Sequence, residues 1–259
     1  MKIAISGKGG VGKTTLTALL AQVNADQGKD VFAVDADPSP CLSGALGIPS
    51  ELQAKLHPIS EMDELIFERT GAKPGTTGGF FTINPQVDDI PEKFSVVHRG
   101  VRLLEMGAVD IGGSGCICPE SALLKTLFTH LLFRKDEVLL LDMYAGVEHL
   151  GRSTVDFVDA MIIVVEPTKR SLGTAAQIKK LAADLGLVRL WMVGNKVQNQ
   201  EEIDFLEANP SDIPLLGILP ASDGVLEADR KGIAVYDHVP ALRTAAEEIA
   251  TKLYQIVED

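Results

Sequence analysis

The sequence Gly7-Lys8-Gly9-Gly10-Val11-Gly12-Lys13-Thr14 decides the fold class of this 259-residue chain. It matches the pattern G-x-x-x-x-G-K-[ST], in which glycines let backbone N–H groups turn toward phosphate oxygens. A short β-rich run (2–6) precedes it, and a helical pattern with apolar residues on one side (14–26) follows it. The motif requires this strand, loop and helix order, so the sequence predicts a phosphate-binding loop.

The residue types of the loop predict how a nucleotide is held. Lys13 is placed to reach the β- and γ-phosphates, and the hydroxyl of Thr14 to bind Mg²⁺. The helix N-terminus adds partial positive charge. The predicted contacts to the nucleotide from this loop are Gly9, Gly10, Val11, Gly12, Lys13, Thr14 and Thr15.

The same loop also fits a second pattern. Gly7, Gly9 and Gly12 have G-x-G-x-x-G spacing, and Asp35 ends the next apolar run, where a ribose-binding acid could lie. A nicotinamide-dependent oxidoreductase is therefore an alternative. The Lys-Thr pair after the last glycine favours a nucleoside triphosphate with Mg²⁺, because a dinucleotide fold has no use for that pair.

The rest of the chain alternates between two patterns. Further apolar runs lie at 31–34, 102–105, 137–141, 160–165, 190–193 and 215–219, and helical patterns at 121–133, 173–185, 201–208 and 242–257. Continuous apolar strands between amphipathic helices are typical of a parallel sheet covered on both faces. We therefore expect an α/β fold with a doubly wound, mostly parallel sheet and helices on both faces.

We expect residues 1–259 to form a single P-loop domain. Residues 50–101 break the rhythm with several glycines and prolines and weak periodicity, which predicts an irregular insertion within it. That insertion is either a surface excursion or a surface for a partner.

The overall charge argues against two kinds of partner. With 24 Lys and Arg against 36 Asp and Glu, the net charge is −12, so nucleic-acid backbones and anionic membranes are repelled. No apolar run approaches the roughly 18 residues of a membrane span. We expect a cytoplasmic protein that binds neither nucleic acid nor membrane.

The lysine at the head of the loop, Lys8, makes the motif resemble the deviant Walker A of the family that includes the nitrogenase iron protein, MinD and the ParA partition ATPases. This resemblance implies that Lys8 reaches across a homodimer to the nucleotide of the partner. It also implies that Asp37 orients the attacking water in switch I and that Asp142 is the Mg²⁺-linked aspartate of switch II. If the resemblance is set aside, the alternative interpretation is that Lys8 is a solvated loop lysine and that each aspartate caps the element that follows it.

The base is expected to be adenine. GTPases of related folds carry Asn-Lys-x-Asp, and in Asn195-Lys196-Val197-Gln198 a glutamine occupies the position of the carboxylate that pairs with guanine. The resemblance implies that Asn195 contacts the adenine edge and that the loop from Pro220 to Asp223 wraps the base. ATP and ADP are therefore the predicted ligands.

Two cysteines, Cys116 and Cys118, lie one residue apart in a glycine-rich loop before a predicted helix. A loop of this kind lowers thiol pKa values and favours soft metals. One chain supplies two sulfurs, so a four-thiolate site needs a second copy, and the lysine in trans already implies one. Four thiolates suit either Zn²⁺ or Ni²⁺; without the loop motif the pair would be incidental thiols.

The residues around these cysteines indicate which branch of the family the chain resembles. In the nitrogenase iron protein a second cluster cysteine lies seven residues after the switch II aspartate, and here that position is His149, which disfavours a shared four-iron cluster. Residues 115–120 and 142–152 instead resemble the CooC family of nickel-insertion ATPases, and the similarity covers essentially the whole chain. It implies a Mg²⁺-dependent ATPase that dimerises with nucleotide and metal and delivers nickel to the carbon monoxide dehydrogenase apo-enzyme.

Three residues near these motifs are less well defined. Tyr144 stands where the family usually has an acid, His149 is either a metal ligand or a structural residue, and Cys41 is expected to be a small buried thiol. The alternative function within the same fold is a partition or positioning ATPase.

Overall fold

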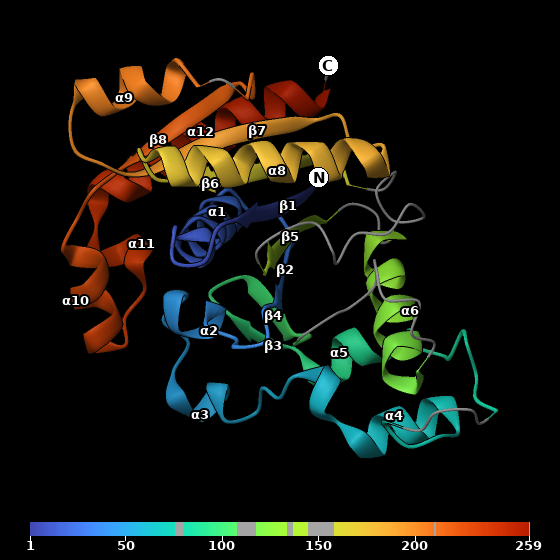
Figure 1. Cartoon of the computed structure of the whole chain (residues 1–259). Helices are drawn as coiled ribbons and strands as arrows, with labels where there is room; N and C mark the ends of the chain where they lie inside the picture. Colours follow the sequence, from blue (N-terminus) through green and yellow to red (C-terminus); the bar gives the residue numbers. More distant parts are fainter. Residues whose placement is uncertain (76–79, 108–117, 134–136, 145–157, 210, 259) are drawn as a thin grey trace.

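The computed structural model describes residues 1–75, 80–107, 118–133, 137–144, 158–209 and 211–258. Its centre is an eight-stranded sheet with the order β3-β4-β2-β5-β1-β6-β7-β8 (Figure 1). The strands are β1 (Lys2–Gly7), β2 (Val31–Ala36), β3 (Val96–His98), β4 (Val101–Glu105), β5 (Val138–Met143), β6 (Ala160–Val165), β7 (Leu190–Val197) and β8 (Leu215–Pro220). Only β3 pairs antiparallel, so the expected mostly parallel sheet is confirmed.

Side chains alternate between the two faces of the sheet. Val31 and Ala33 of β2 join one buried cluster, and Phe32 and Val34 join the other. Because both clusters are apolar, the central strands β2, β5 and β6 are buried along their whole length and need a helical layer on each side. This confirms the predicted doubly wound fold.

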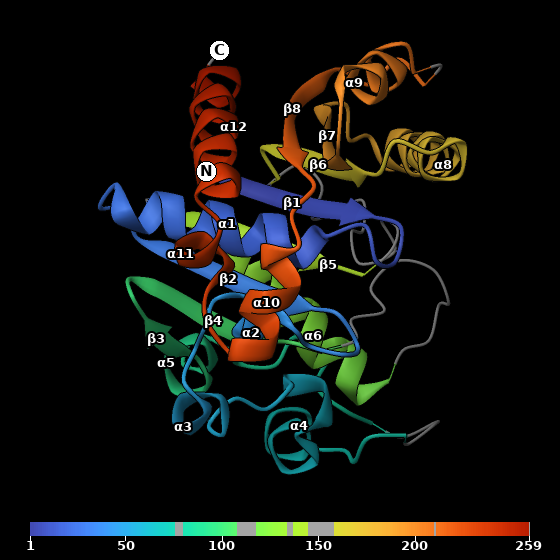
Figure 2. The ribbon, with the colours of Figure 1, turned by 90° about the vertical axis from the view of Figure 1, so that its left-hand side faces the viewer.

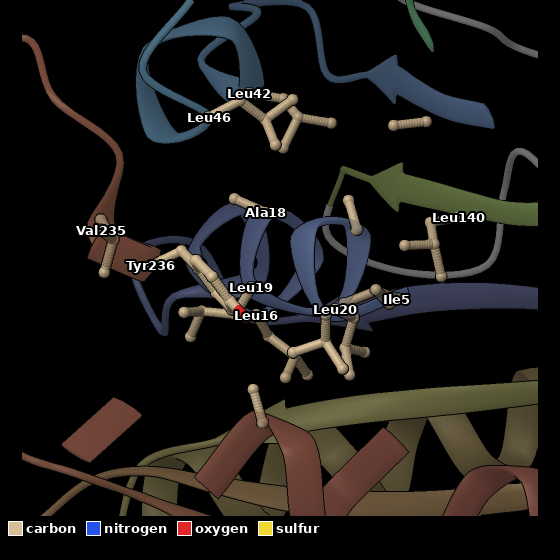
Figure 3. Close-up of a cluster of buried hydrophobic side chains, with 14 of the residues drawn as sticks. Ile5, Leu16, Ala18, Leu19, Leu20, Leu42, Leu46, Leu140, Val235 and Tyr236 are labelled. Atoms are coloured by element: carbon tan, nitrogen blue, oxygen red, sulfur yellow. The ribbon is translucent and has the colours of Figure 1, made fainter. Parts of the chain in front are cut away.

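One helical layer is built around α1 (Lys13–Asp26) (Figure 3). Leu16, Leu19 and Leu20 of α1 are completely buried, and burial of one leucine contributes about 1.5–3 kcal/mol. Figure 2 shows α11 (Val235–His238) and α12 (Pro240–Glu258) lying against α1. The same layer includes α2 (Leu42–Ala45) and α10 (Gly224–Lys231).

The other layer consists of α6 (Pro119–Phe133), α8 (Lys169–Leu185) and α9 (Gln200–Glu207). In α8 every inward position is apolar or small, such as Leu172, Ala175 and Ile178. The part of the chain that the structure describes has no helix with the length and apolarity needed to cross a membrane.

The segment from 50 to 101 has more secondary structure than its glycines and prolines predict. It contains α3 (Ser50–Gln53), the 3₁₀ turn η1 (Ile59–Glu61), α4 (Asp63–Thr70), α5 (Ile90–Phe94) and the edge strand β3. Ile59, Ile66 and Ile90 are fully buried in the same cluster as α6. Tertiary burial of these three side chains therefore compensates for weak local periodicity.

The strand order reverses at β1. From β1 the chain crosses to β2 and β4 on one side, and after β5 it continues to β6, β7 and β8 on the other. Ligands of doubly wound folds bind outside the carboxyl ends of the strands at such a reversal. The predicted phosphate-binding loop follows β1 at this point.

Candidate functional site

The loop between β1 and α1 is a tight turn that requires glycine at two positions. Gly7 has φ 149°, and a Cβ there would lie 2.4 Å from the carbonyl oxygen of Val164 in β6. Gly12 has φ 96°, and a Cβ there would lie 2.1 Å from Asn195 Nδ2. The loop therefore packs directly against β6 and β7 and leads the positive end of α1 into the site.

Lys13, the first residue of α1, is directed back into this loop. Its side chain is buried, and its Nζ lies 3.5 Å from the carbonyl oxygen of Lys8. Lys8 itself is half-buried, whereas Gly9 and Gly10 are exposed. A buried ammonium group beside exposed loop glycines is the arrangement that binds a phosphate chain.

The end of β7 holds the other side of the loop. Asn195 Nδ2 donates to the carbonyl oxygen of Val11 at 2.7 Å, and Asn195 Oδ1 accepts from the backbone N–H of Lys196 at 2.8 Å. Lys196 Nζ donates to the carbonyl oxygen of Gly10 at 2.8 Å and forms an ion pair with Glu166 at 2.6 Å. Two consecutive side chains thus bind two consecutive carbonyl groups of the loop.

Asn195 was expected at the adenine edge, and no role was predicted for Lys196 or Glu166. In the structure the Asn195 side chain is buried against the loop. Lys196 has φ 59°, which is uncommon for a residue with a side chain and tends to occur at functional sites. The Asn-Lys pair was a sequence signal for Lys196, whereas Glu166 directly follows β6 and no local pattern indicated it.

Pro220 and Asp223 lie beside this region. Pro220 ends β8 opposite Val197, and the backbone N–H of Ala221 donates to the carbonyl oxygen of Val197 at 2.9 Å. Asp223 is exposed and directly precedes α10. The structure therefore brings the start of this loop, residues 220 and 221, to the strand that carries Asn195.

On the other side of β1, three carboxyl groups lie in one row. Glu105, Asp35 and Asp142 are register partners on the neighbouring strands β4, β2 and β5. All three side chains are buried. Burial is the largest cause that raises the pKa of each of them.

Asp142 shows the largest effect. Burial and the nearby Asp35 carboxyl raise its pKa to about 7, while the Thr14 hydroxyl and Lys13 act in the opposite direction. Neither carboxyl oxygen has a hydrogen-bond partner of ordinary geometry. A buried carboxylate without partners is costly unless a cation or a donor compensates for it.

These groups fit a magnesium ion. Mg²⁺ prefers oxygen ligands, and the unpartnered oxygens of Asp142 lie near the hydroxyl of Thr14. Asp37, one residue after β2, is half-buried at the same edge of the sheet. The fold thus brings Lys13 together with the predicted residues Thr14, Asp37 and Asp142. A bound cation would neutralise the negative charge of the Asp142 carboxylate.

Asp35 is completely buried, and its carboxylate already accepts hydrogen bonds from the protein backbone. Its carboxylate accepts the backbone N–H groups of Asp37 at 3.1 Å, Cys41 at 2.9 Å and Leu42 at 2.9 Å. A ribose hydroxyl would have to displace these bonds. The structure therefore gives no support to the dinucleotide alternative, in which Asp35 binds ribose.

The cysteines are only partly described. Cys118 is half-buried before α6 and its Sγ donates to Ser121 Oγ at 3.0 Å, whereas Cys116 and His149 lie outside the described residues. Within those residues no group of three or more His, Cys, Asp or Glu side chains is arranged as a metal site. Tyr144, directly after β5, is half exposed.

The prediction that Cys41 is buried was wrong. Cys41 is exposed and its Sγ donates to the carbonyl oxygen of Ser39 at 3.2 Å. It occupies the N-cap position of α2, at the surface loop that follows β2, so the fold leaves its thiol outside the core. Partial burial of the thiol and then the charges of Asp35 and Asp37 raise its pKa, which disfavours the thiolate.

Comparisons with known proteins identify the relatives of the chain. Residues 2–235 match the family model described as the CobQ/CobB/MinD/ParA nucleotide binding domain. The chain is 47% identical to the carbon monoxide dehydrogenase accessory protein CooC of Rhodospirillum rubrum, over 99% of this chain and 97% of that protein. It is also 46% identical to an uncharacterized ATP-binding protein of Methanocaldococcus jannaschii, over 90% of each chain.

Solved structures share the fold at lower identity. The MinD protein of a MinC–MinD complex from Aquifex aeolicus has a TM-score of 0.68 with 22% identity, covering 98% of this chain and 95% of that chain. MinD from Pyrococcus horikoshii, solved with Mg-ADP, has a TM-score of 0.65 with 24% identity, covering 97% and 94%. The chain belongs to the CobQ/CobB/MinD/ParA nucleotide-binding family, and within it to the CooC-like P-loop ATPases.

Proposed function

We propose that this ATPase dimerises with nucleotide and metal and delivers nickel to carbon monoxide dehydrogenase during its maturation. The observation that carries the proposal is the 47% identity to CooC over nearly the whole length of both chains. The cysteine pair Cys116 and Cys118 and the loop lysine Lys8 give the chain residues suited to this task.

In the proposed hydrolysis, the loop from Gly9 to Thr15 holds the phosphates of ATP. Lys13 and, from the partner subunit, a second copy of Lys8 neutralise charge that develops on the transferred phosphoryl group. Asp37 orients the attacking water. When bound at Thr14 and Asp142, Mg²⁺ supplies further neutralisation of the phosphate oxygens.

The base is proposed to lie between β7 and the loop after β8. Pro220 pairs with the strand that carries Asn195, Asp223 follows three residues later, and Gln198 is not suited to recognise guanine. In this arrangement Asn195 both contacts adenine and keeps its bond to the carbonyl group of Val11. Binding of the base and the position of the loop are then linked through one side chain.

The cargo is proposed to be one Ni²⁺ ion between two copies of Cys116 and Cys118. Two chains provide four thiolates, which Ni²⁺ accepts in a square plane and Zn²⁺ in a tetrahedron. Because the same dimer would hold both the metal and the lysine in trans, each ligand must strengthen binding of the other. Release of the ion to the dehydrogenase apo-site follows hydrolysis.

The decisive experiment measures mass in solution, with and without Ni²⁺ or Zn²⁺ and with ADP or ATP. Cys116→Ser and Cys118→Ser should abolish metal-induced dimers and leave nucleotide affinity largely intact. Cys41→Ser is the matched control, because it also removes one thiol, which is exposed, and should leave dimerisation unchanged. If the double variant of Cys116 and Cys118 still dimerises with metal, the shared thiolate site is wrong.

A partition or positioning ATPase is the second candidate, because MinD structures share the fold. The net charge of −12 argues against it, since DNA and anionic lipid would be repelled. We propose a cytoplasmic protein that binds neither. Co-sedimentation with DNA or anionic vesicles at low salt, with ATP and Mg²⁺, would reveal the alternative.

A further inference from the structure

We infer that Glu166 is a positioning residue for the nucleotide, and that it acts through Lys196 on the phosphate-binding loop. The two side chains form a support of no net charge that fixes the direction of the loop N–H groups, and neither contacts the nucleotide. The inference rests on the part of the proposed function in which this loop holds the phosphates of ATP. Three features of the structure support it.

The first feature is an irregularity at the end of β7. Successive side chains of a regular strand point to opposite faces of the sheet, yet Asn195 and Lys196 both bind the loop after β1. The register between β7 and β8 shifts between Gly194 and Val197, and Lys196 has φ 59°. Bulges of this kind re-aim side chains next to functional sites. The irregular backbone therefore turns a second side chain of β7 toward the loop.

The second feature is the pair of carbonyl groups that these side chains hold. Lys196 Nζ binds the carbonyl oxygen of Gly10 at 2.8 Å, and Asn195 Nδ2 binds that of Val11 at 2.7 Å. The described chain has no cis peptide bond, and in a trans peptide the C=O and N–H groups point in opposite directions. With both carbonyl oxygens held toward β7, the N–H groups of Val11 and Gly12 point away from it.

The N–H group of Val11 shows where this direction leads. It points to the carbonyl oxygen of Lys8 at 3.4 Å, and Lys13 Nζ lies 3.5 Å from the same oxygen. The N–H group is thus directed to the side of the loop where the buried ammonium group lies. Backbone N–H groups and a lysine on one side of a glycine-rich loop are the arrangement that binds phosphate.

The third feature is the way in which Glu166 is held. Its carboxylate accepts from Lys196 Nζ at 2.6 Å. Its backbone N–H donates to Ser171 Oγ at 3.0 Å, and its carbonyl oxygen accepts from the N–H of Thr168 at 2.7 Å. Thr168 in turn caps α8 by accepting the N–H of Ser171 at 3.2 Å. The capped end of α8 therefore fixes the backbone from which the Glu166 carboxylate reaches Lys196.

These contacts distinguish an effect of position from an effect of charge. A carboxylate near ATP repels the phosphates, so by charge alone the loss of Glu166 strengthens ATP binding. If Glu166 instead keeps Lys196 at the Gly10 carbonyl group, the same loss weakens ATP binding, because the loop is less well held. The direction of the change in affinity therefore decides between the two.

The test is Glu166→Gln, which keeps the size of the side chain and removes its charge. The Kd for ATP with Mg²⁺, from isothermal titration, should rise by about 2- to 5-fold, the usual effect of a partly exposed ion pair. ADP should be affected alike, since the loop holds phosphates that both nucleotides carry. In steady-state hydrolysis KM should rise and kcat should stay nearly unchanged, because the loop binds the ground state and the transition state equally.

A double-mutant cycle tests whether Glu166 acts through Lys196. The double variant Glu166→Gln, Lys196→Met should bind ATP no more weakly than Lys196→Met alone. Glu202→Gln is the matched control, because this carboxylate accepts the N–H of Gln198 at 2.6 Å, just after β7, and not a group of the loop. It removes the same charge and should not weaken ATP binding. Thermal unfolding verifies that each variant is folded.

The outcomes separate this inference from the proposed function. If Glu166→Gln binds ATP as tightly as the unaltered protein or more tightly, or if the losses in the double variant are additive, the role of Glu166 is wrong while the proposed nucleotide site stands. If Lys13→Ala binds ATP as tightly as the unaltered protein, the proposed nucleotide site itself fails, and the role of Glu166 fails with it.

Discussion

The carboxyl edge of the sheet has two halves, one on each side of β1, and their polar side chains differ in how completely they are hydrogen-bonded. Beside β1, Glu166 directly follows β6 and β7 carries Asn195 and Lys196, and these side chains are joined to one another or to the loop by hydrogen bonds. On the other side, β5 carries Asp142, which is buried and whose carboxyl oxygens have no hydrogen-bond partner of ordinary geometry. We call these the amide half and the carboxylate half.

The difference indicates which half needs a ligand to compensate its buried charge. The amide half is complete without nucleotide, so it holds the loop in shape before ATP binds and reduces the cost of ordering it. The carboxylate half is electrostatically incomplete, because two buried acids lie side by side in Asp35 and Asp142. Binding of a cation with the nucleotide relieves this repulsion, so ligand binding should mainly stabilise the carboxylate half.

The largest expected effect is that of Asp142→Asn. Without the carboxylate, Mg²⁺-dependent hydrolysis should fall by about 100-fold or more. The nucleotide-free protein should nevertheless become more stable at pH 8, because the buried charge is removed. Steady-state ATPase rates and denaturant unfolding measure the two effects.

The pH dependence of this stability has a definite sign. The pKa of Asp142 rises from 3.8 to about 7 on folding, so its stabilising contribution is present below pH 3.8 and is lost as the pH rises through 7. The free energy of unfolding of Asp142→Asn, relative to the unaltered protein, should therefore increase between pH 4 and 7, by on the order of 2–4 kcal/mol. A difference that stays constant with pH would show that Asp142 is ionised throughout.

A smaller effect is expected where the amide half meets the loop. In Gly12→Ala the new Cβ would lie 2.1 Å from Asn195 Nδ2 at φ 96°, so the loop must move and ATP should bind at least about tenfold more weakly. Isothermal titration with ATP and Mg²⁺ measures this. The control is Gly173→Ala in α8, where nothing lies within 4 Å and alanine favours the helix; its ATP affinity should be unchanged.

The smallest effect is expected for Lys196→Met. It removes one hydrogen bond to the Gly10 carbonyl group, which contributes about 0.5–1.5 kcal/mol, so ATP affinity should fall by roughly 2- to 10-fold. Lys179→Met is matched to it, because Lys179 Nζ donates to the carbonyl oxygen of Ser211 at 2.7 Å on another part of the surface. Equal losses in both variants would mean that Lys196 has no particular role at the loop.

Local pattern was sufficient for much of the fold. The apolar run at 160–165 predicts β6 to the residue, since a strand buried on both faces must be apolar throughout. The segment 50–101 was less predictable, because β3 is a three-residue edge strand that depends on pairing with β4. Short elements of this kind carry too few residues to show a period.

The residues of the site also differ in how well they could be predicted from the sequence. Lys13, Thr14 and the glycines were recognisable because the phosphate loop is a continuous motif whose chemistry needs those residues in that order. Asp35 was noted only as a ribose ligand, and its three bonds to the switch I loop became visible with the coordinates.

The sequence alone determined that this chain has a phosphate loop between a strand and a helix, strands buried on both faces, and a pair of closely spaced cysteines. These features depend on neighbours along the chain. Only the tertiary structure decided that Asp142, Asp35 and Glu105 share one row and that Lys196, paired with Glu166, binds the loop. Those relations depend on strand order and register, which bring together residues that are far apart in the sequence.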